Sequence, residues 1–372
     1  MSVLGQAIDT ISLLPIGGPG CCNFAVTNAC NANCDFCNYA RDKTFVTQRV
    51  FVDYDKACQA MDILYDRGIR FLTFSGGEPT LHPKLKDMVA YAVKKGMRPS
   101  VVTNGGRLTP ALLNDLKNSG LKTMFISIDS PSAEEHEKNR GLPNVWARIK
   151  EANVECKRLS IKTIASVTIN RLIKDFSELV NSLKDLGFET VTFSYPKRVP
   201  GSSLVYSETS ELVDFTTDEL IQAFETVQSL KGKFGVLNPR ESLADMVRLL
   251  QNEKQMFPCY GGYKYFYLDC NLDVYRCDSW PTKMSSIFEF RDQPFIRDNC
   301  TKCMSDCYRD ASMLMHPAIS VGDAIENVRK GQVFGAIANL GKPSNAISLK
   351  TLIEDWSTLN KLAKIDTSSQ GN

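Results

Sequence analysis

Three cysteines lie within eight positions of the chain, at Cys30, Cys34 and Cys37 of the stretch CNANCDFC. Thiolates bind zinc, and they also hold iron–sulfur clusters, in which each thiolate of a [4Fe–4S] cubane binds one iron. Three thiolates would leave the fourth iron with open positions for a substrate or cofactor. A zinc site completed by a distant ligand and three unligated thiols are the alternatives, and spacing alone does not separate them.

The other cysteines are also grouped, because six of the thirteen lie between positions 259 and 307. The N-terminus lacks the charged start, apolar run and cleavage site of a signal peptide. Thiols in such a chain predict a cytoplasmic protein that binds metal rather than one that forms disulfides. Cys58 and Cys156 stand alone in helical patterns and are expected to act as small core residues.

The composition describes an ordinary globular protein. Of 372 residues, 43% are hydrophobic and 23% charged, which suits one large α/β domain with an addition, or two domains. A net charge of +2 without a basic stripe gives no reason to expect nucleic acid. The apolar runs fall far short of the roughly 20 residues of a membrane span. Three histidines argue against histidine-based hydrolysis and most zinc catalysis.

From about residue 22 to 194, short β-rich runs alternate with helical patterns, which is typical of parallel β/α units. The sequence predicts six strands, at 23–27, 69–74, 97–103, 122–129, 161–170 and 190–195. The predicted helices are 54–68, 83–95, 109–118, 143–158 and 174–186. Six units are fewer than the eight of a closed TIM barrel, so an open partial barrel or a doubly wound sheet is expected.

Polar loops follow four of these strands: TNACNANC, SGGEP, TNGG and SIDS. In both architectures ligands gather at the carboxyl ends of parallel strands. The loops should therefore share one rim. This convergence predicts a ligand site there.

The motif C-x3-C-x2-C with Phe36 before its third cysteine, followed in order by SGGEP, TNG and SID, resembles the radical S-adenosylmethionine (SAM) superfamily over residues 22–195. The resemblance implies an α/β fold with a partial (β/α)6 TIM-like barrel. It implies an enzyme in which Cys30, Cys34 and Cys37 hold a [4Fe–4S] cluster and SAM chelates the fourth iron. An electron from the cluster would split SAM into methionine and a 5′-deoxyadenosyl radical, which abstracts hydrogen or adds to an alkene.

The same resemblance implies which residues hold SAM. Gly76 and Gly77 would let the backbone approach the methionyl amine, and Glu78 would supply a negative partner. Ser127 and Arg140 are the candidates for the SAM carboxylate, although in KNRGLP Arg140 is equally a surface-loop residue. The full set of expected SAM contacts is Phe36, Asn38, Tyr39, Ser75, Gly76, Gly77, Glu78, Thr103, Asn104, Ser127, Arg140 and Asn170.

The stretch YLDCNLDVYRC resembles the hairpin of the auxiliary-cluster domains called SPASM and Twitch. Its turn reads DCNLD where an aspartate–glycine turn is usual, so Cys270 stays unassigned and Asn271 is expected to tolerate a positive φ. The resemblance favours one auxiliary [4Fe–4S] cluster over a structural zinc ion. Its expected ligands are Cys259, Cys277, Cys300 and Cys303, with Cys307 as an alternative to Cys303 or a ligand of a second cluster.

These patterns divide the chain into five predicted parts. They are an N-terminal helical segment at 1–20, a radical SAM core at 21–196, a linker with helices at 197–256, an auxiliary-cluster domain at 257–315 and a helical tail at 316–372. Apolar residues at helical spacing between 3 and 14, and again between 349 and 365, are expected to cover the parent domain. An apolar substrate entrance or contact with a membrane surface is the alternative.

The expected substrate is a small organic molecule or a lipid, because the roughly 20 residues before the core are too few for a leader-peptide-binding or cobalamin-binding domain. A peptide maturase is the alternative, and a non-catalytic iron–sulfur electron carrier is the rival from another class. The expected partner is an external electron donor such as flavodoxin or ferredoxin.

Overall fold

The computed structural model describes residues 17–42, 48–196, 210–355 and 358. The predicted N-terminal helical segment therefore lies almost wholly outside the described residues, as does most of the irregular connection after Pro196. The amphipathic stretch at 349–365 is described only in part.

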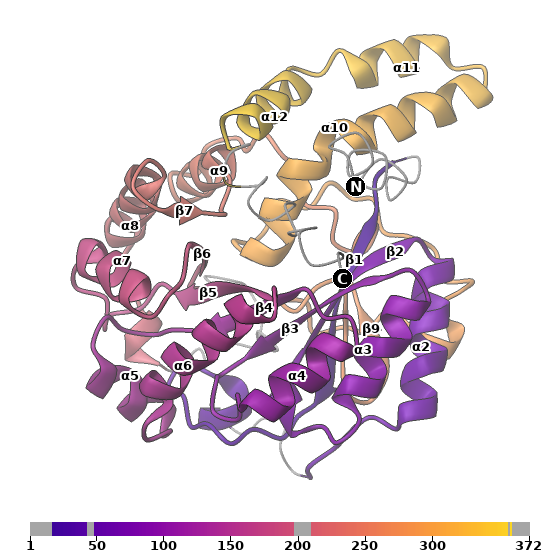
Figure 1. Ribbon diagram of the computed structural model, residues 1–372. Coiled ribbons are helices and arrows are strands. Elements are labelled where there is room, and N and C mark those ends of the chain that lie inside the picture. Colours follow the sequence, from indigo (N-terminus) through magenta and orange to yellow (C-terminus); the bar gives the residue numbers. More distant parts are fainter. Residues whose placement is uncertain (1–16, 43–47, 197–209, 356–357, 359–372) are drawn as a thin grey trace, which may run out of the picture.

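Six parallel strands form the centre of the molecule, joined by helices that lie on the outer face of the sheet (Figure 1). The strands are β1 Gly20–Thr27, β2 Ile69–Gly76, β3 Arg98–Thr103, β4 Thr123–Ser127, β5 Lys162–Thr168 and β6 Thr190–Ser194. The intervening helices are α2 Tyr54–Asp66, α3 Leu85–Lys94, α4 Pro110–Asn118, α6 Val145–Arg158 and α7 Phe176–Asp185. The partial (β/α)6 barrel is confirmed.

Local chemistry explains why these elements begin and end where they do. In α2 the Asp53 side chain accepts a hydrogen bond from the Lys56 N–H at 3.0 Å, and Gly68 follows the helix with φ +87°. Apolar residues at intervals of three and four positions bury one face of α2 against the sheet. Buried residues alternate with partly exposed residues along β3 and β4, so one face of these strands is buried and the other is only partly covered.

Helix α5, Ala133–Arg140, was not predicted, because its sequence AEEHEKNR has no apolar periodicity. The Ser132 side chain caps it by accepting from the Glu135 N–H at 3.4 Å, and Gly141 ends it with φ +61°. Arg140 is therefore the buried last residue of a helix and does not lie in a surface loop, which corrects one of the two expectations for it.

The cysteine-rich segment extends the central sheet. After α8 Thr217–Leu230, β7 Gly235–Val236 and α9 Arg240–Leu250, strand β8 Tyr265–Leu268 runs parallel to β1. Strand β9 Asp273–Tyr275 pairs antiparallel with β8, and β10 Ser285–Ser286 pairs with β9. The sheet then has the order β10-β9-β8-β1-β2-β3-β4-β5-β6-β7. The predicted hairpin is therefore hydrogen-bonded to the core.

The turn of this hairpin differs from expectation. Leu272, and not Asn271, has the positive φ, at +65°. One oxygen of the Asp269 carboxylate accepts from the N–H groups of Asn271 and Asp273 at 2.9 and 2.8 Å. The aspartate thus shapes a turn that lacks the usual glycine.

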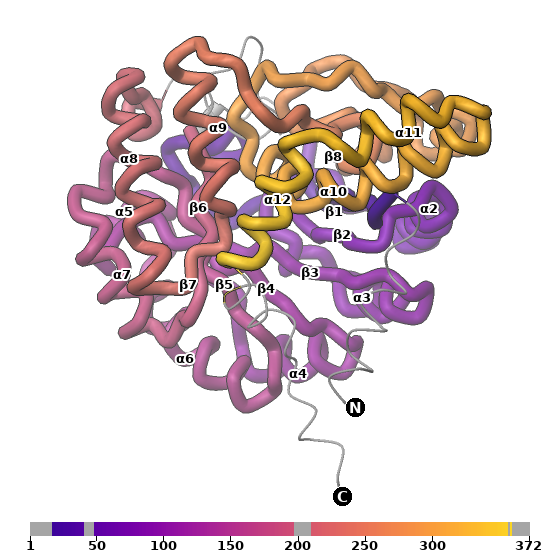
Figure 2. The backbone as a smooth tube through the Cα atoms, turned by 90° about the horizontal axis from the view of Figure 1, so that it is seen from above, coloured from indigo at the N-terminus to yellow at the C-terminus, as the bar shows by residue number. Residues whose placement is uncertain are grey.

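Three helices complete the described chain: α10 Asp306–Arg329, α11 Val333–Leu340 and α12 Pro343–Glu354. Helix α10 begins over the carboxyl end of β6, where Ser194 Oγ lies 3.3 Å from an Asp306 carboxylate oxygen, and it carries α11 to the edge of the molecule (Figures 1 and 2). Single turns lie at Asn38–Asp42, Pro79–Leu81, Glu211–Val213 and Ile287–Glu289. No helix among the described residues combines the length and apolar character needed to span a bilayer.

Candidate active site

The loop that follows β1 brings Cys30, Cys34 and Cys37 together at the carboxyl end of the sheet. Their thiols are close enough for each to influence the ionisation of another. Cys30 Sγ accepts from the Ala32 N–H at 3.4 Å and faces the Asn104 amide at 3.8 Å. The loop therefore brings the three thiols close together, and the Ala32 N–H and the Asn104 amide are directed toward one of them, Cys30.

Burial raises the pKa of all three thiols, to about 11 for Cys30. The Arg140 guanidinium opposes this rise at each of them. A buried group of thiols whose ionisation is otherwise unfavourable is suited to a cationic metal centre, which replaces the protons on sulfur. Among the described residues, no three Cys, His, Asp or Glu side chains converge on the position of a single metal ion. In a cubane, by contrast, each thiolate binds a different iron.

The SGGEP loop is joined directly to the cysteine loop. Gly77 N–H donates to Thr27 O and Glu78 N–H donates to Ala29 O, both at 2.8 Å. A Cβ on Gly76 would lie 2.1 Å from Thr27 O, and one on Gly77 would lie 2.3 Å from Ala29 O. The two glycines are thus required by the approach of the two loops, a reason different from the expected approach to the SAM amine.

Glu78 is a fully buried carboxylate at the centre of this rim. Oε1 accepts from Thr80 N–H at 3.0 Å, Thr80 Oγ1 at 2.6 Å and Thr103 Oγ1 at 2.8 Å, and Oε2 accepts from Asn104 N–H at 2.7 Å. Burial raises the pKa of Glu78 above its ordinary value, and hydrogen bonds from these donors oppose that rise only in part. Glu78 therefore fixes the loops after β2 and β3 to each other, and Asn104 in turn faces Cys30.

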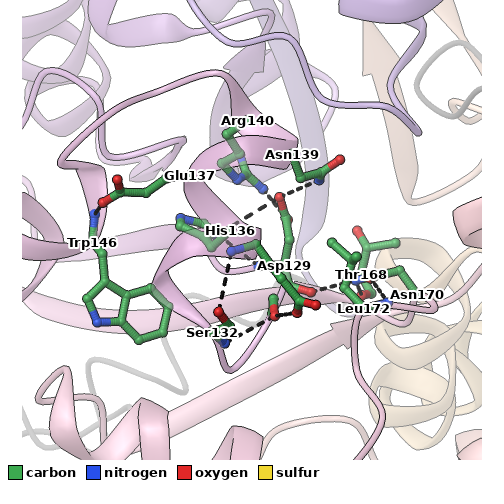
Figure 3. A network of polar contacts seen from close by, with 12 residues as sticks. Asp129, Ser132, His136, Glu137, Asn139, Arg140, Trp146, Thr168, Asn170 and Leu172 are labelled. Atoms are coloured by element: carbon green, nitrogen blue, oxygen red, sulfur yellow. Dashed lines mark hydrogen bonds and ion pairs between the residues drawn. The ribbon is translucent and has the colours of Figure 1, made fainter.

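Asp129, in the SIDS loop after β4, lies at the centre of a second network of polar contacts (Figure 3). Its carboxylate accepts from Arg140 Nη2 at 2.6 Å and from Asn139 Nδ2 at 2.8 Å. Burial raises the pKa of Asp129, but Arg140, His136 and Asn139 together lower it below its ordinary value. Asn170 Nδ2 donates to the Asp129 carbonyl at 2.8 Å, so the Asn170 side chain holds the backbone of the loop after β4.

The end of α5 is hydrogen-bonded directly to the cysteine loop. Asn33 N–H donates to the Arg140 carbonyl at 2.8 Å, and Asp35 N–H donates to the Asn139 side chain at 3.3 Å. Arg140 Nε is buried without a hydrogen-bond partner in the described part of the chain. Asp129 and Asn139 were missed as site residues, although SIDS contained the aspartate. Asn139 carried no recognisable signal because α5 itself was not predicted.

Three expected SAM contacts, Phe36, Asn38 and Tyr39, are buried around the start of the Asn38–Asp42 turn. The Tyr39 hydroxyl lies 2.6 Å from that of Tyr267 on β8. Ser75 and Ser127 are partly exposed near the ends of β2 and β4. A cavity of about 940 Å³ opens beside the cysteine loop; it is lined by Asn33, Asp35, Ala40, Glu135, Lys138, Asn139, Leu172, Glu211 and Leu212.

The structure also brings the second cysteine group together. Cys259 and Cys300 form an antiparallel bridge in which Cys259 N–H donates to Cys300 O at 2.7 Å. Burial, together with the thiolates of Cys303 and Cys300, raises the pKa of Cys259 to about 12. The Cys277 thiol is likewise affected by Cys303 and Cys259. These four thiols were the expected ligand set.

Cys303 and Cys307 differ in their surroundings. Cys303 is buried near Cys259 and Cys277, whereas Cys307 is exposed in the first turn of α10 with its Sγ 3.5 Å from an Asp306 carboxylate oxygen. Cys270 lies in the turn of the β8–β9 hairpin and remains outside this group. The geometry favours Cys303 over Cys307 as the fourth thiol.

The comparison with protein families decides the nature of the first site. Residues 24–186, which contain all three loop cysteines, match the family model described as the radical SAM superfamily. The chain therefore contains a radical SAM domain. Members of this superfamily are enzymes that use SAM with a [4Fe–4S] cluster, and the three converging thiols fit that cluster.

Individual radical SAM proteins resemble the chain over different spans. The AdoMet-dependent heme synthase of Methanosarcina barkeri is 24% identical, over 73% of this chain and 79% of that protein. Three further relatives are matched over 45–49% of their own length. Streptococcus suis SuiB bound to S-adenosylmethionine has a TM-score of 0.55 at 14% identity, over 78% of this chain and 70% of that one. The protein anSMEcpe with bound AdoMet also has a TM-score of 0.55 at 14% identity, over 93% and 100%.

One acidic group of this radical SAM protein had no sequence signal. Asp310 of α10 lies near the end of β6, where it accepts from Ser242 Oγ at 2.5 Å, Asn238 Nδ2 at 2.8 Å and Tyr195 Oη at 3.3 Å. Desolvation and the neighbouring Asp306 raise its pKa to about 7. Because these groups come from three separate segments, at 195, 238–242 and 306–310, only the fold could reveal them.

Proposed function

We propose that this radical SAM enzyme cleaves SAM reductively at the Cys30, Cys34 and Cys37 site and acts on a small organic molecule or a lipid. The observation that carries the proposal is the convergence of these thiols at a rim built by the Gly77, Glu78 and Arg140 contacts. These residues would hold the cluster and SAM; with one electron from a flavodoxin- or ferredoxin-type donor, the pair would supply the reductive cleavage of SAM to methionine and a 5′-deoxyadenosyl radical able to take a hydrogen atom from the substrate or add to it.

Arg140 would provide positive charge at this site. Burial lowers its pKa, but Asp129 and the Cys34 thiolate raise it well above its ordinary value, so the guanidinium stays charged. A buried cation favours thiolates nearby, and its unpartnered Nε is a donor suited to a carboxylate. Holding the SAM carboxylate is therefore the role proposed for Arg140.

Glu78 would act as a positioning residue. Its two oxygens accept from four donors of the protein, so its negative charge is already engaged in fixing Thr80, Thr103 and Asn104. The SAM amine would then be held by backbone groups at the rim, with Glu78 keeping those groups in place. This refines the expected direct contact between Glu78 and the amine.

The second group of thiols, Cys259, Cys277, Cys300 and Cys303, would bind one auxiliary [4Fe–4S] cluster. The Tyr39–Tyr267 contact and the pairing of β8 with β1 place the segment carrying these thiols against the strand that leads to Cys30. Such an arrangement would serve electron transfer or substrate binding. A structural zinc ion on the same residues is the alternative.

The small-molecule proposal is supported by the heme synthase match, which covers most of both chains. A peptide substrate is the second candidate, favoured by the fold of SuiB, one structure of which holds the precursor peptide SuiA. Among the described residues, the lining of the cavity beside the cysteine loop includes the carboxylates Asp35, Glu135 and Glu211 together with the cation Lys138. Its carboxylates would suit a substrate of either class that carries a positive group.

The test is anaerobic reconstitution with iron and sulfide, followed by dithionite and SAM. We expect about eight irons per chain and formation of 5′-deoxyadenosine. Cys30→Ala should abolish 5′-deoxyadenosine and leave about four irons. The control Cys58→Ala, which changes a thiol of α2 outside both groups, should retain both properties. An electron carrier would hold iron and give no 5′-deoxyadenosine, and that result would overturn the proposal.

A further inference from the structure

Helix α11 presents its large apolar side chains to the outside. Phe334 is 89% exposed, Ile337 63%, Val333 54% and Leu340 53%. The face that packs against α10 consists of small residues, since Ala336 is buried and a Cβ on Gly335 would lie 3.0 Å from the Asn327 side chain. A surface helix ordinarily turns its large apolar residues inward. In α11 this arrangement is reversed.

One apolar residue beside α11 is exposed as well. Val328, at the end of α10 that leads into α11, is 57% exposed. In both views α11 lies at the outer edge of the molecule, at the end of the hairpin that it forms with α10 (Figures 1 and 2). A flat surface could therefore meet α11 without meeting the barrel. An exposed apolar patch of this kind is typical of an interaction site.

Positive charges flank this helix. From 329 to 342 the sequence RKGQVFGAIANLGK contains three basic residues and no acidic residue. Arg329 and Lys330 are exposed at the α10 end, and Lys342 lies at the α12 end. Glu326 pairs with Lys330 at 2.5 Å, and Asp355 is turned inward to Lys231 at 3.1 Å. The apolar residues thus lie between Arg329 with the paired Lys330 at one end and Lys342 at the other.

We propose that α11 and the adjoining ends of α10 and α12 dock on a lipid bilayer that contains anionic lipid. Apolar side chains on a short helix enter the headgroup–acyl boundary, and basic residues beside them meet anionic headgroups. A second copy of the chain fits less well. A helix of eight residues is about 12 Å long and 10 Å wide, which gives far less than the roughly 800 Å² per partner of a stable dimer.

The test is co-sedimentation of the full-length chain with vesicles of phosphatidylcholine mixed with phosphatidylglycerol, and of phosphatidylcholine alone. The wild type should bind the anionic vesicles preferentially. Phe334→Ser combined with Ile337→Ser should weaken binding by roughly tenfold or more, because two buried apolar side chains are lost. Arg329→Gln combined with Lys330→Gln should remove most of the preference for anionic vesicles.

Val154→Ser is the matched control, since Val154 is 71% exposed on α6 of the barrel; vesicle binding should be unchanged. Thermal unfolding of each variant checks that the fold is retained, as expected for exposed positions. Failure of the wild type to bind, or equal binding by the Phe334/Ile337 variant, would overturn the proposal. So would a dimer that this variant disperses, because the face would then be covered by a second copy.

Discussion

The hydroxyl of Tyr39 lies 2.6 Å from the hydroxyl of Tyr267, and both side chains are buried. Tyr39 follows Cys37 by two positions, and Tyr267 lies on β8, which leads away from Cys259. One hydrogen bond therefore connects the loop that carries the first cysteines to the segment that carries the second group. The two candidate metal sites are joined by a polar contact as well as by the pairing of β8 with β1.

Tyr39→Phe or Tyr267→Phe should each lower the free energy of unfolding by about 1–2 kcal/mol, because each leaves the other hydroxyl buried without this partner. The double variant should cost less than the sum of the single variants, since it removes both hydroxyls together. Urea unfolding of all four proteins measures this coupling, expected to be about 1 kcal/mol. Additive effects would show that the hydrogen bond does not link the two segments energetically.

Gly77→Ala should prevent the cysteine loop from adopting its observed position, because the new Cβ would lie 2.3 Å from Ala29 O. We expect the iron content after anaerobic reconstitution to fall from about eight to about four per chain. Gly232→Ala is the control, since nothing lies within 4 Å of its Cβ position. A Gly77→Ala protein that binds iron like the control would show that the loop can shift without loss of its site.

Cys303→Ser and Cys307→Ser distinguish the two candidates for the fourth auxiliary thiol. Because Cys303 is buried beside Cys259 and Cys277, its replacement should remove about one cubane of iron. Replacement of the exposed Cys307 should leave the iron content unchanged. Iron analysis and the visible absorption spectrum measure both. Loss of iron from Cys307→Ser alone would reverse the assignment.

The barrel was predictable because its information is local. Each strand is a short apolar run, and each helix buries one periodic face, so their order and the shared rim of their loops follow from the sequence. Helix α5 was missed because eight mostly polar residues carry no such period, and its role depends on contacts between Arg140 and Asn33. Capping by Ser132 and Gly141 was the one available signal.

Contacts between distant segments were not predictable. Nothing in the residues 265–268 indicates that they pair with β1, because parallel pairing depends on the arrangement of the whole sheet. Gly77 was identified as a close-approach position, but only the structure shows that Ala29 O is what approaches it. The tolerance of Asn271 for a positive φ made the hairpin turn feasible, but only the structure shows that the positive φ falls on Leu272, in a turn held by the Asp269 carboxylate.

Asp310 should make the stability of the folded chain depend on pH. Desolvation and the nearby Asp306 raise its pKa from 3.8 to about 7. Between these values the folded chain keeps a proton that the unfolded chain has lost, so stability falls as pH rises and the fall is complete above about pH 7. Asp310→Asn cannot titrate, and its amide can still accept from Asn238 and donate to Ser242.

The free energy of unfolding of Asp310→Asn, measured against the wild type, should therefore improve by about 1 kcal/mol between about pH 6 and about pH 8. Asp66→Asn, which changes an exposed carboxylate 2.8 Å from Arg291, is the control and should show no such improvement. Urea titrations at the two pH values give the difference in the free energy of unfolding between each of the two variants and the wild type. A constant difference between Asp310→Asn and the wild type would mean that the folded chain ionises this carboxyl as readily as the unfolded chain does.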